Sequence, residues 1–209
     1  MLNRSLIFAT RNQGKTLELK ELLAGFDIDI KNLKDFGPIP PVVEDGEAFE
    51  DNAYKKAHFT AKILGAPALA DDSGLAVEAI YGAPGIHSHR YAGDDATDED
   101  NNVKLLEEMK GETNRNAFFE SVIVIAVPKG PALTYQGRCY GEIAYEQKGE
   151  NGFGYDPIFY YPPLKKTFAQ ISREEKNRVS HRGKAMFGLR NEFDKVMIWL
   201  AQRMAEEHF

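Results

Sequence analysis

Two periodicities of apolar and polar residues alternate along the first part of the chain. Residues 5–9 form a short apolar run typical of a buried strand, and residues 19–26 carry apolar side chains at the i, i+3, i+4 and i+7 spacing of an amphipathic helix. A second strand over residues 28–33 and a second helix over residues 47–64, which Gly65 terminates, repeat this order. The alternation of strands with helices predicts an α/β fold.

The middle of the chain is rich in β-branched and aromatic residues, which favour strands. Residues 117–127, 132–137 and 138–145 are predicted to be consecutive, largely antiparallel strands. The Lys-Gly-Pro sequence at residues 129–131 is typical of the hairpin turn between the first two. The middle region therefore adds hairpin-connected strands to the α/β pattern.

Further helices are predicted in the second half of the chain. Thr97 and Asp100 have the spacing of a capping box, which starts a helix that reaches Met109. After Ser180, apolar residues at helical spacing as far as Met204 predict one long C-terminal helix packed on the core. No internal repeat or low-complexity linker divides the chain, so we expect a single domain over residues 1–209, either as one large unit or as two closely packed lobes.

Composition and charge narrow the classes of function. The net charge is -6, whereas a nucleic-acid partner requires a broad basic face, so a small phosphate ligand is favoured over a nucleic acid. No apolar run approaches the ~20 residues of a membrane span, so no membrane partner is expected. The single cysteine, Cys139, excludes an intrachain disulfide and fits a reducing compartment. We expect a soluble, unprocessed, cytoplasmic protein in which Cys139 is a buried small hydrophobe.

Two adjacent carboxylates are the most informative feature of the sequence. Asp71 and Asp72 follow the short apolar run at residues 68–70 and precede Ser73 and Gly74, which predicts a glycine turn at the end of a strand. Acids at the end of a strand can hold a metal, but an acidic surface turn is at least as good an interpretation of this segment alone. The acidic residues of the 94–100 segment are interpreted differently, as a solvated loop and helix start.

The first loop, residues 9–16, favours an anion. Asn12 tolerates a tight turn, Gly14 opens a helix, and the helix N-terminus together with Lys15 attracts a phosphate. The loop also matches a relaxed phosphate-loop pattern in which Ala9 replaces the leading glycine. That match is weak, because a β-carbon at the leading position hinders the wrapping of the backbone around a phosphate. A simple turn between a strand and a helix is the competing interpretation.

Other segments could approach a nucleotide. Asn52 and Lys56, four residues apart, project from one helix face beside its apolar stripe. The two glycines that flank Phe153 free the backbone to present the ring to a flat base, although a turn with a core Phe is an equal alternative. Residues 172–175 form a capping box that places Lys176 in a short helix, and Ser180 caps the helix that starts with His181 and Arg182.

Seven motifs in one order along the chain resemble the inosine triphosphate pyrophosphatase family. Each motif is weak alone, but the set in register is specific and spans the chain from Thr10 to Arg182. The motifs are Thr10-x-Asn12-x-x-Lys15, Glu44-x-Gly46, Asp71-Asp72-Ser73-Gly74-Leu75, Pro84-Gly85-x-x-Ser88-x-Arg90-Tyr91, Gly152-Phe153-Gly154-Tyr155-Asp156-Pro157, Glu174-Glu175-Lys176-Asn177 and Ser180-His181-Arg182.

The resemblance implies a fold and an activity. It implies a two-lobed α/β fold around a long mixed β-sheet with flanking helices, in which the active site lies in the groove between the lobes. It also implies a homodimer that uses Mg²⁺ to hydrolyse deaminated purine nucleoside triphosphates, such as ITP, dITP and XTP, to the monophosphate and pyrophosphate.

The resemblance also implies a role for individual residues. Asp72 would be the general base and a metal ligand, with Glu44 completing the metal site, although Asp71 is an alternative second ligand. Ser73 would contact the substrate. The residues expected to hold the triphosphate are Thr10, Arg11, Asn12, Gln13, Gly14, Lys15 and Lys56. The residues expected to surround the base, sugar and nearby phosphate are Phe153, Gly154, Tyr155, Asp156, Lys176, His181 and Arg182. The sequence departs from the common family pattern at Arg11, His89 and Asn151.

Two other functions remain open at the level of the sequence. A phosphate-loop NTPase or kinase would use Lys15 and Thr16, with Asp72 as its second metal-binding acid. A nucleotide-sensing or RNA-binding module without turnover would require a broad basic and aromatic surface, which the sequence lacks.

Overall fold

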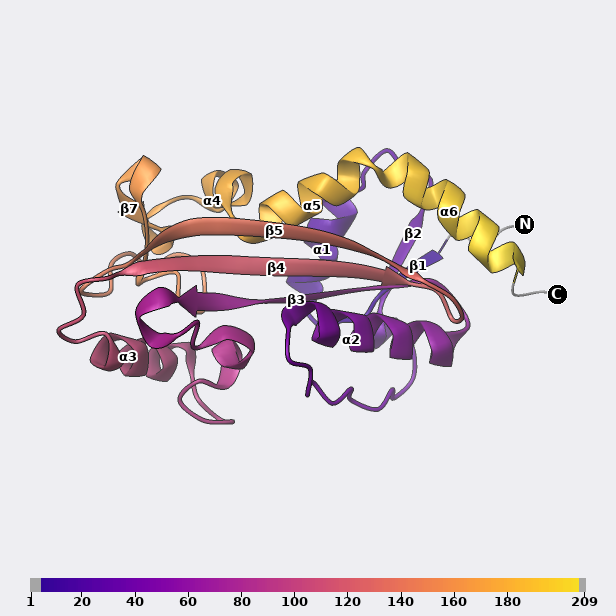
Figure 1. Cartoon of the computed structure of the whole chain (residues 1–209). Coiled ribbons are helices and arrows are strands. Elements are labelled where there is room, and N and C mark those ends of the chain that lie inside the picture. Colours follow the sequence, from indigo (N-terminus) through magenta and orange to yellow (C-terminus); the bar gives the residue numbers. More distant parts are fainter. Residues whose placement is uncertain (1–4, 207–209) are drawn as a thin grey trace. The chain divides into compact units, whose positions relative to one another are not determined.

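A computed structural model describes residues 5–206 as an α/β protein with a seven-stranded mixed sheet (Figure 1). The strand order in the sheet is β2-β1-β3-β4-β5-β6-β7, with β1 parallel to β2 and β3, and β6 antiparallel to β5 and β7. The strands are β1 (Ser5–Phe8), β2 (Asp29–Asn32), β3 (Ala68–Val77), β4 (Asn116–Ala126), β5 (Ala132–Ile143), β6 (Phe159–Tyr161) and β7 (Lys166–Thr167). The predicted α/β class and mixed sheet are confirmed.

Six α-helices accompany the sheet within the described residues. The capping boxes predicted at Thr97 and Ser172 are both present at helix starts, and Ser180 accepts a hydrogen bond from the N–H of Gly183 as the predicted cap. The helices are α1 (Gln13–Leu22), α2 (Phe49–Leu64), α3 (Asp98–Glu108), α4 (Arg173–Val179), α5 (His181–Asn191) and α6 (Phe193–Glu206).

The chain forms two compact units, each made of several segments. Unit 1 comprises residues 1–72, 122–136 and 185–209, and unit 2 comprises residues 73–121 and 137–184. Strands β3, β4 and β5 contribute residues to both units, and each unit has its own cluster of buried apolar side chains.

Unit 1 is a three-layer arrangement of helices and strands. Leu6 and Phe8 in β1 are fully buried in a cluster with apolar residues of α1, α5 and α6, which includes an edge-to-face contact between Phe26 and Phe193. Ile7, on the opposite face of β1, is also buried, and Figure 1 shows α2 on the side of the strands opposite α5 and α6. Burial on both faces explains why the β1 run is continuously apolar.

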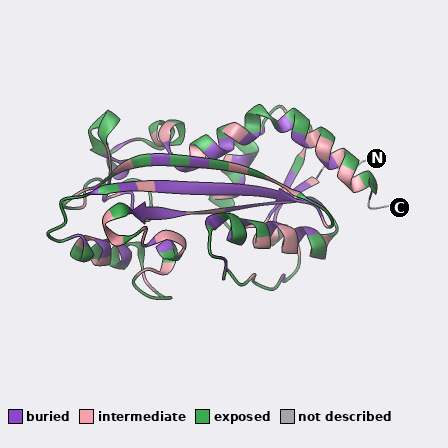
Figure 2. Ribbon diagram, viewed as in Figure 1, coloured by how far each residue is buried: buried purple, intermediate pink, exposed green. Residues whose placement is uncertain are grey.

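Unit 2 has an aromatic core. The rings of Phe119, Phe159 and Phe168 pack with centroid separations of 4.6 to 6.0 Å. Cys139 is fully buried beside them, as predicted, and burial raises the pKa of its thiol to about 11. A thiol of that pKa is inert at neutral pH. Figure 2 shows β4 buried along most of its length, while β5 also exposes residues to solvent.

The glycine turn predicted at Asp71–Gly74 is wrong. These residues lie inside β3, which continues to Val77, because Leu75 and Val77 are fully buried in the core of unit 2. Asp and Gly are common in turns, but burial of the apolar residues that follow keeps the strand extended.

Other boundaries also differ from the prediction, since the first helix ends at Leu22 rather than Phe26. Residues 132–143 form one strand rather than two, since Gly137 lies within β5 and not in a break. The C-terminal helix is divided at Glu192, whose N–H bonds to the carbonyl of Leu189 in a tighter, three-residue turn. Helix α2 begins at Phe49 rather than residue 47, because the Asp51 carboxylate caps the N–H groups of residues 47 and 48. Within residues 5–206, no helix is long and apolar enough to cross a membrane.

Candidate active site

The first loop caps helix α1 rather than forming a phosphate loop. Asn12 is the N-cap, and its side-chain oxygen accepts the N–H of Lys15 at 3.2 Å. The hydroxyl of Thr16 donates to the Asn12 carbonyl at 3.0 Å and accepts from the Asn32 amide at 3.0 Å. Thr16 is buried by these contacts, so it does not present the hydroxyl that a phosphate-loop enzyme uses for its metal.

The two adjacent carboxylates lie where β3 passes the end of β1. Strand β1 pairs with β3 only at residues 68–69 and ends at Phe8, so Asp71 and Asp72 extend beyond their parallel neighbour. Successive side chains of a strand point to opposite faces, which separates the two carboxylates. In open α/β sheets, ligands bind beyond the carboxyl ends of the parallel strands.

Each carboxylate meets a lysine from a different helix. The Lys15 ammonium of α1 bonds to both oxygens of Asp71, at 3.0 and 2.9 Å, and Asp71 is buried. The Lys56 ammonium of α2 bonds to Asp72 at 2.8 Å and to Glu44 at 3.0 Å. Both lysines predicted to bind the triphosphate are therefore held at this edge of the sheet by carboxylates.

Burial and charge compete at the Lys56–Asp72 pair. Burial raises the pKa of Asp72 more than the Lys56 ammonium lowers it, so the net direction is upward. For Lys56, burial alone would lower the pKa, but the charges of Asp72 and Glu44 outweigh it and raise the pKa. Asp72 is consequently a stronger base than an ordinary exposed aspartate, and it lies beside a lysine whose charged form its carboxylate neighbours stabilise.

The loop that carries Glu44 is fixed by Asn52, a buried residue of α2. The side-chain oxygen of Asn52 accepts the N–H of Gly46 at 2.8 Å. A β-carbon at Gly46 would lie 2.5 Å from the Asp51 β-carbon and 2.7 Å from the Asn52 oxygen, so glycine is required for this approach. The sequence placed Asn52 on the same face as Lys56, but it gave no indication that the amide holds the loop.

The donor set at this edge fits a magnesium ion. Glu44 and Asp72 converge on one cationic centre, the Lys56 ammonium, and carboxylate oxygens are the ligands that Mg²⁺ prefers. Within residues 5–206, no three His, Cys, Asp or Glu side chains converge as a ready-made metal site. Mg²⁺ is commonly bound by one or two carboxylates together with water and substrate phosphates, so a two-carboxylate set is sufficient.

Two other predicted phosphate-binding residues make local contacts. The exposed Arg11 donates to the carbonyl of Ile39 at 2.9 Å, and the Thr10 hydroxyl accepts the N–H of Asn12 at 3.1 Å. Gln13 and Gly14 are exposed in the first turn of α1. All of the predicted triphosphate and metal residues thus belong to unit 1, whereas Ser73, which follows Asp72 in β3, is the first residue of unit 2.

The predicted base-binding residues lie in unit 2 around a buried ion pair. Asp156, which is 2 % exposed, pairs with the Lys176 ammonium and accepts the N–H of Phe153 at 3.0 Å. Burial raises the pKa of Asp156 against the lowering effect of Lys176. Gly152 has a φ of 83°, and a β-carbon there would lie 2.0 Å from an Asp156 oxygen, so glycine is required at this position.

Phe153 is exposed to solvent, which favours the presented ring over the core Phe that the sequence left as an equal alternative. Its side chain is 67 % exposed, and the Lys176 ammonium lies 4.4 Å from the ring centroid. Tyr155 differs from Phe153 because it is buried, with its hydroxyl donating to the carbonyl of Ser88 at 2.7 Å. One aromatic residue of the motif is therefore a core residue, and the other is free to stack on a base.

His181 and Arg182 begin α5 at a sharp junction with α4. Ser180 ends α4 and caps α5, and a β-carbon at Gly183 would lie 1.8 Å from the Asn177 carbonyl. His181 stacks on the ring of Phe119 with centroids 4.6 Å apart. The junction therefore places His181 against the aromatic core of unit 2.

Two residues that the sequence did not identify hold the 152–156 loop. The carboxylate of Asp98 accepts the N–H of Gly154 at 2.6 Å, and the amide of Asn102 donates to the Gly154 carbonyl at 2.8 Å. The interpretation of the 94–100 segment as solvated is therefore incomplete, although its helix start is confirmed. The only available signal was the spacing of Asp98 and Asn102, which places both on one face of α3.

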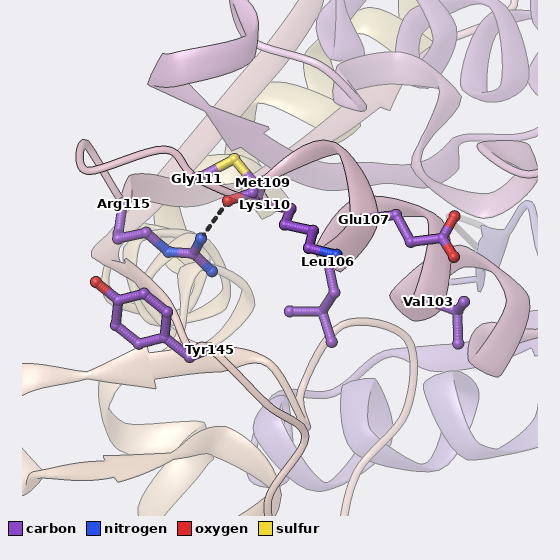
Figure 3. A pocket seen from close by; sticks show the side chains of 8 residues that line it. All are labelled: Val103, Leu106, Glu107, Met109, Lys110, Gly111, Arg115 and Tyr145. Carbon is purple, nitrogen blue, oxygen red and sulfur yellow. Dashed lines mark hydrogen bonds between the residues drawn. The ribbon is translucent and has the colours of Figure 1, made fainter.

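A pocket of about 410 Å³ lies elsewhere in unit 2, and no predicted site residue lines it (Figure 3). The Arg115 guanidinium at its wall donates to the carbonyls of Met109, Ile143 and Ala144. The Tyr145 ring lies 4.6 Å from this guanidinium. The Arg115 guanidinium thus links the end of α3 to the end of β5 and the residue after it. We therefore interpret this pocket as a structural feature rather than as a ligand site.

The fold and these clusters define a mixed-sheet α/β protein with paired acids and lysines beyond the end of a parallel strand. The sequence profile of the Ham1 family matches residues 6–192, and the chain belongs to that family. A protein of Desulfotalea psychrophila named dITP/XTP pyrophosphatase is 56% identical over 202 residues, which are 97% of this chain and 91% of that protein. A protein of the same name from Syntrophobacter fumaroxidans is 57% identical, over 97% of this chain and 88% of that protein.

Solved structures agree with the family assignment. The HAM1 protein of Coxiella burnetii superposes with a TM-score of 0.89 at 40% identity, over 91% of this chain and 98% of the other. The Ham1 protein of Staphylococcus aureus gives a TM-score of 0.87 at 42% identity, with the same coverage. The fold expected from the motifs is therefore shared with solved members of the family.

Proposed function

We propose that this chain hydrolyses deaminated purine nucleoside triphosphates, including dITP, ITP and XTP, to the monophosphate and pyrophosphate. The observation that carries this proposal is the group formed by Lys15, Lys56, Glu44, Asp71 and Asp72 beyond the end of β1. Relatives named dITP/XTP pyrophosphatase that match 97% of this chain at 56% and 57% identity support the same activity.

In the proposed reaction, Asp72 accepts a proton from the attacking water. An ordinary aspartate, with a pKa of ~3.9, is far too weak a base for water, with a pKa of ~15.7, since ~12 units correspond to roughly 16 kcal/mol. Burial raises the pKa of Asp72, which reduces this gap in the required direction. Asp72 and Glu44 would hold Mg²⁺, which supplies charge neutralisation and acidifies water when it is bound.

The two lysines would neutralise the triphosphate. Lys15 lies in the first turn of α1, where the helix N-terminus also favours an anion, and it pairs with Asp71. Lys56 pairs with Asp72 and Glu44 from α2. Their present carboxylate partners keep both ammonium groups ordered, so a phosphate meets positioned cations. Positioning and charge stabilisation account for most of the catalysis of phosphoryl transfer.

We assign binding of the purine base to the predicted base-binding residues of unit 2. Phe153 would stack on the ring, which is worth ~1 to 3 kcal/mol for any base. Lys176, His181 and Arg182 supply donors for the 6-oxo group of hypoxanthine and xanthine. Adenine has an amino group at that position, so a site built from donors would leave them unsatisfied, at a cost of ~1 to 3 kcal/mol.

A panel of nucleoside triphosphates with product identification tests the activity. We expect pyrophosphate and monophosphate as products, and a preference for ITP, dITP and XTP over ATP and GTP of at least ~100-fold in kcat/KM, or about 2.7 kcal/mol. Equal kcat/KM for ATP and ITP would exclude the deaminated-purine assignment. Inorganic phosphate or a phosphorylated acceptor would instead support the NTPase or kinase hypothesis, which the engaged hydroxyl of Thr16 disfavours.

We also propose a cytoplasmic homodimer, on the basis of the family resemblance. Sedimentation analysis should then give a particle of twice the 23.5 kDa chain mass. A monomer at micromolar concentration would contradict this part of the proposal without affecting the assigned reaction.

A further inference from the structure

Helix α3 holds the backbone of the proposed base-binding loop at one residue. We call Asp98 and Asn102 the α3 clamp, because together they bind both polar backbone groups of Gly154. The Asp98 carboxylate accepts the Gly154 N–H at 2.6 Å, and the Asn102 side-chain nitrogen donates to the Gly154 carbonyl at 2.8 Å. The two residues are four apart in α3 and therefore share a face.

The orientation of the Asn102 side-chain amide is fixed by the two hydrogen bonds that its nitrogen donates. Asn102 is 2 % exposed, and its nitrogen also donates to the main-chain carbonyl of Asp98 at 2.8 Å. Its side-chain oxygen is buried and makes no hydrogen bond within residues 5–206. A buried acceptor without a partner is costly, and the two bonds that the Asn102 nitrogen donates offset part of this cost.

Tyr155 anchors one side of the loop in the core of unit 2, whereas the part that carries Phe153 depends on support from outside the loop. Gly152 and Gly154 have positive φ angles of 83° and 60°, and the Phe153 ring between them is largely exposed. Exposed loops with few apolar contacts open readily. Asp156 restrains one end of this loop by accepting the Phe153 N–H, and the α3 clamp restrains the centre.

We propose that Asp98 and Asn102 are positioning residues for base recognition. By fixing Gly154, the α3 clamp holds the adjacent Phe153 ring in the orientation that stacks on a purine. This inference rests on the proposed function, because it requires that Phe153 meets a base. The clamp touches the loop and not the triphosphate group in unit 1, so its loss should weaken binding of the base and leave the chemical step unchanged.

Paired substitutions distinguish the clamp from general stabilisation of α3. Asp98→Asn keeps an acceptor for the Gly154 N–H, whereas Asp98→Ala removes it. Asn102→Asp keeps the size of the side chain but puts an oxygen against two carbonyl oxygens. Glu99→Ala is the matched control, because Glu99 lies in the same turn of α3 and its carboxylate accepts from Gln147 at 2.8 Å.

Hydrogen–deuterium exchange tests the clamp whether or not the proposed function is correct. We expect exchange of a peptide covering residues 152–156 to be roughly 10-fold faster in Asp98→Ala and Asn102→Asp, with wild-type rates in Glu99→Ala and near wild-type rates in Asp98→Asn. Unchanged exchange in the first two variants, or equal acceleration in Glu99→Ala, would overturn the clamp.

Kinetics then test its role toward the base. We expect the KM for ITP to rise roughly 10-fold in Asp98→Ala and Asn102→Asp with kcat within about 3-fold, while inhibition by inorganic tripolyphosphate, which has no base, is unchanged. Equal weakening of tripolyphosphate, or a loss confined to kcat, would overturn the positioning role. If the wild type turns over no triphosphate, the proposed function fails, and calorimetric binding of ITP to the same variants decides the inference.

Discussion

The two groups of predicted site residues are built in different ways. In unit 1, both lysines and the Asp pair stand on regular elements, with Lys15 in α1, Lys56 in α2 and the acids in β3. Glu44 alone lies on a loop, which the Asn52 side chain holds. In unit 2, Phe153 lies on a loop whose shape depends on glycines and on hydrogen bonds from distant side chains. Secondary structure thus positions most of the charged residues of unit 1, whereas individual long-range contacts position the Phe153 ring of unit 2.

This difference predicts different responses to substitution. A charged residue on a rigid strand or helix can be changed with little effect on its neighbours, so loss of function should be chemical. A loop residue held by a few polar contacts should transmit any change to the whole loop. The strongest test of the comparison is therefore a substitution in unit 1 that removes activity and preserves the fold.

Asp72→Asn should provide that test. It removes the proposed base and a charge, but keeps the size of the side chain within β3, so we expect kcat for ITP to fall roughly 10³-fold with an unchanged melting temperature. Asp45→Asn is the control, because Asp45 is an exposed acid that pairs with Lys55 at 2.7 Å. Near wild-type kcat in Asp72→Asn would remove Asp72 from the proposed chemistry.

Lys15→Ala should show that the unit 1 group also contributes to the free energy of unfolding. Its partner Asp71 is almost fully buried, and breaking a buried pair costs about 3 to 5 kcal/mol, which we reduce to about 2 kcal/mol because Lys15 is 29% exposed. Urea unfolding measures this loss. The double variant Lys15→Ala/Asp71→Asn should recover part of it, and a double variant no more stable than Lys15→Ala would contradict coupling of the pair.

Gly152→Ala and Gly154→Ala separate the cost of backbone strain in the unit 2 loop from the cost of displacing the Asp156 carboxylate. Both have positive φ, so both should lose about 1 to 2 kcal/mol from backbone strain. Only Gly152→Ala also displaces the Asp156 carboxylate, since a β-carbon at Gly154 meets no atom within 4 Å. We therefore expect a higher KM for ITP in Gly152→Ala than in Gly154→Ala. Equal values would show that the Asp156–Lys176 pair does not shape the base site.

Lys56→Met removes a proposed triphosphate contact and should lower kcat/KM for ITP at every pH, but its most specific effect is a small shift in pH dependence. Lys56 lowers the pKa of Asp72 against the effect of burial, so its removal should raise that pKa further. Because the base must be ionised, the acid limb of the kcat/KM profile for ITP should move up by about one pH unit. Lys55→Met, next to it in α2, should leave the limb in place. If the acid limb of the profile stays in place in Lys56→Met, Asp72 does not control it.

Much of the unit 1 group could be predicted from sequence because helices and strands have fixed periods. The 19–26 apolar spacing predicted α1, and therefore the position of Lys15 at its N-terminus. The exception was the turn at Asp71–Gly74, where local turn preference favoured the wrong conformation and burial of the residues that follow decided the outcome.

The support of the unit 2 loop could not be predicted in the same way. Asp98 and Gly154 are 56 residues apart, and no periodicity connects a helix start to the backbone of a distant loop. Ser88 is a similar case, because its hydroxyl accepts the N–H of Leu75 and its carbonyl accepts the Tyr155 hydroxyl. Motif order identified these segments as important, but only the tertiary structure shows which contacts join them.

The position of Asp71 and Asp72 in an extended strand has a consequence for sequence variation. One inserted or deleted residue between Leu69 and Asp71 would exchange the faces of the two acids, bringing each to the wrong helix and the wrong lysine. Length changes in this segment could be tolerated only in pairs of residues. Strand β3 should therefore be free of single-residue gaps in functional descendants of this chain, even where the loops around it vary in length.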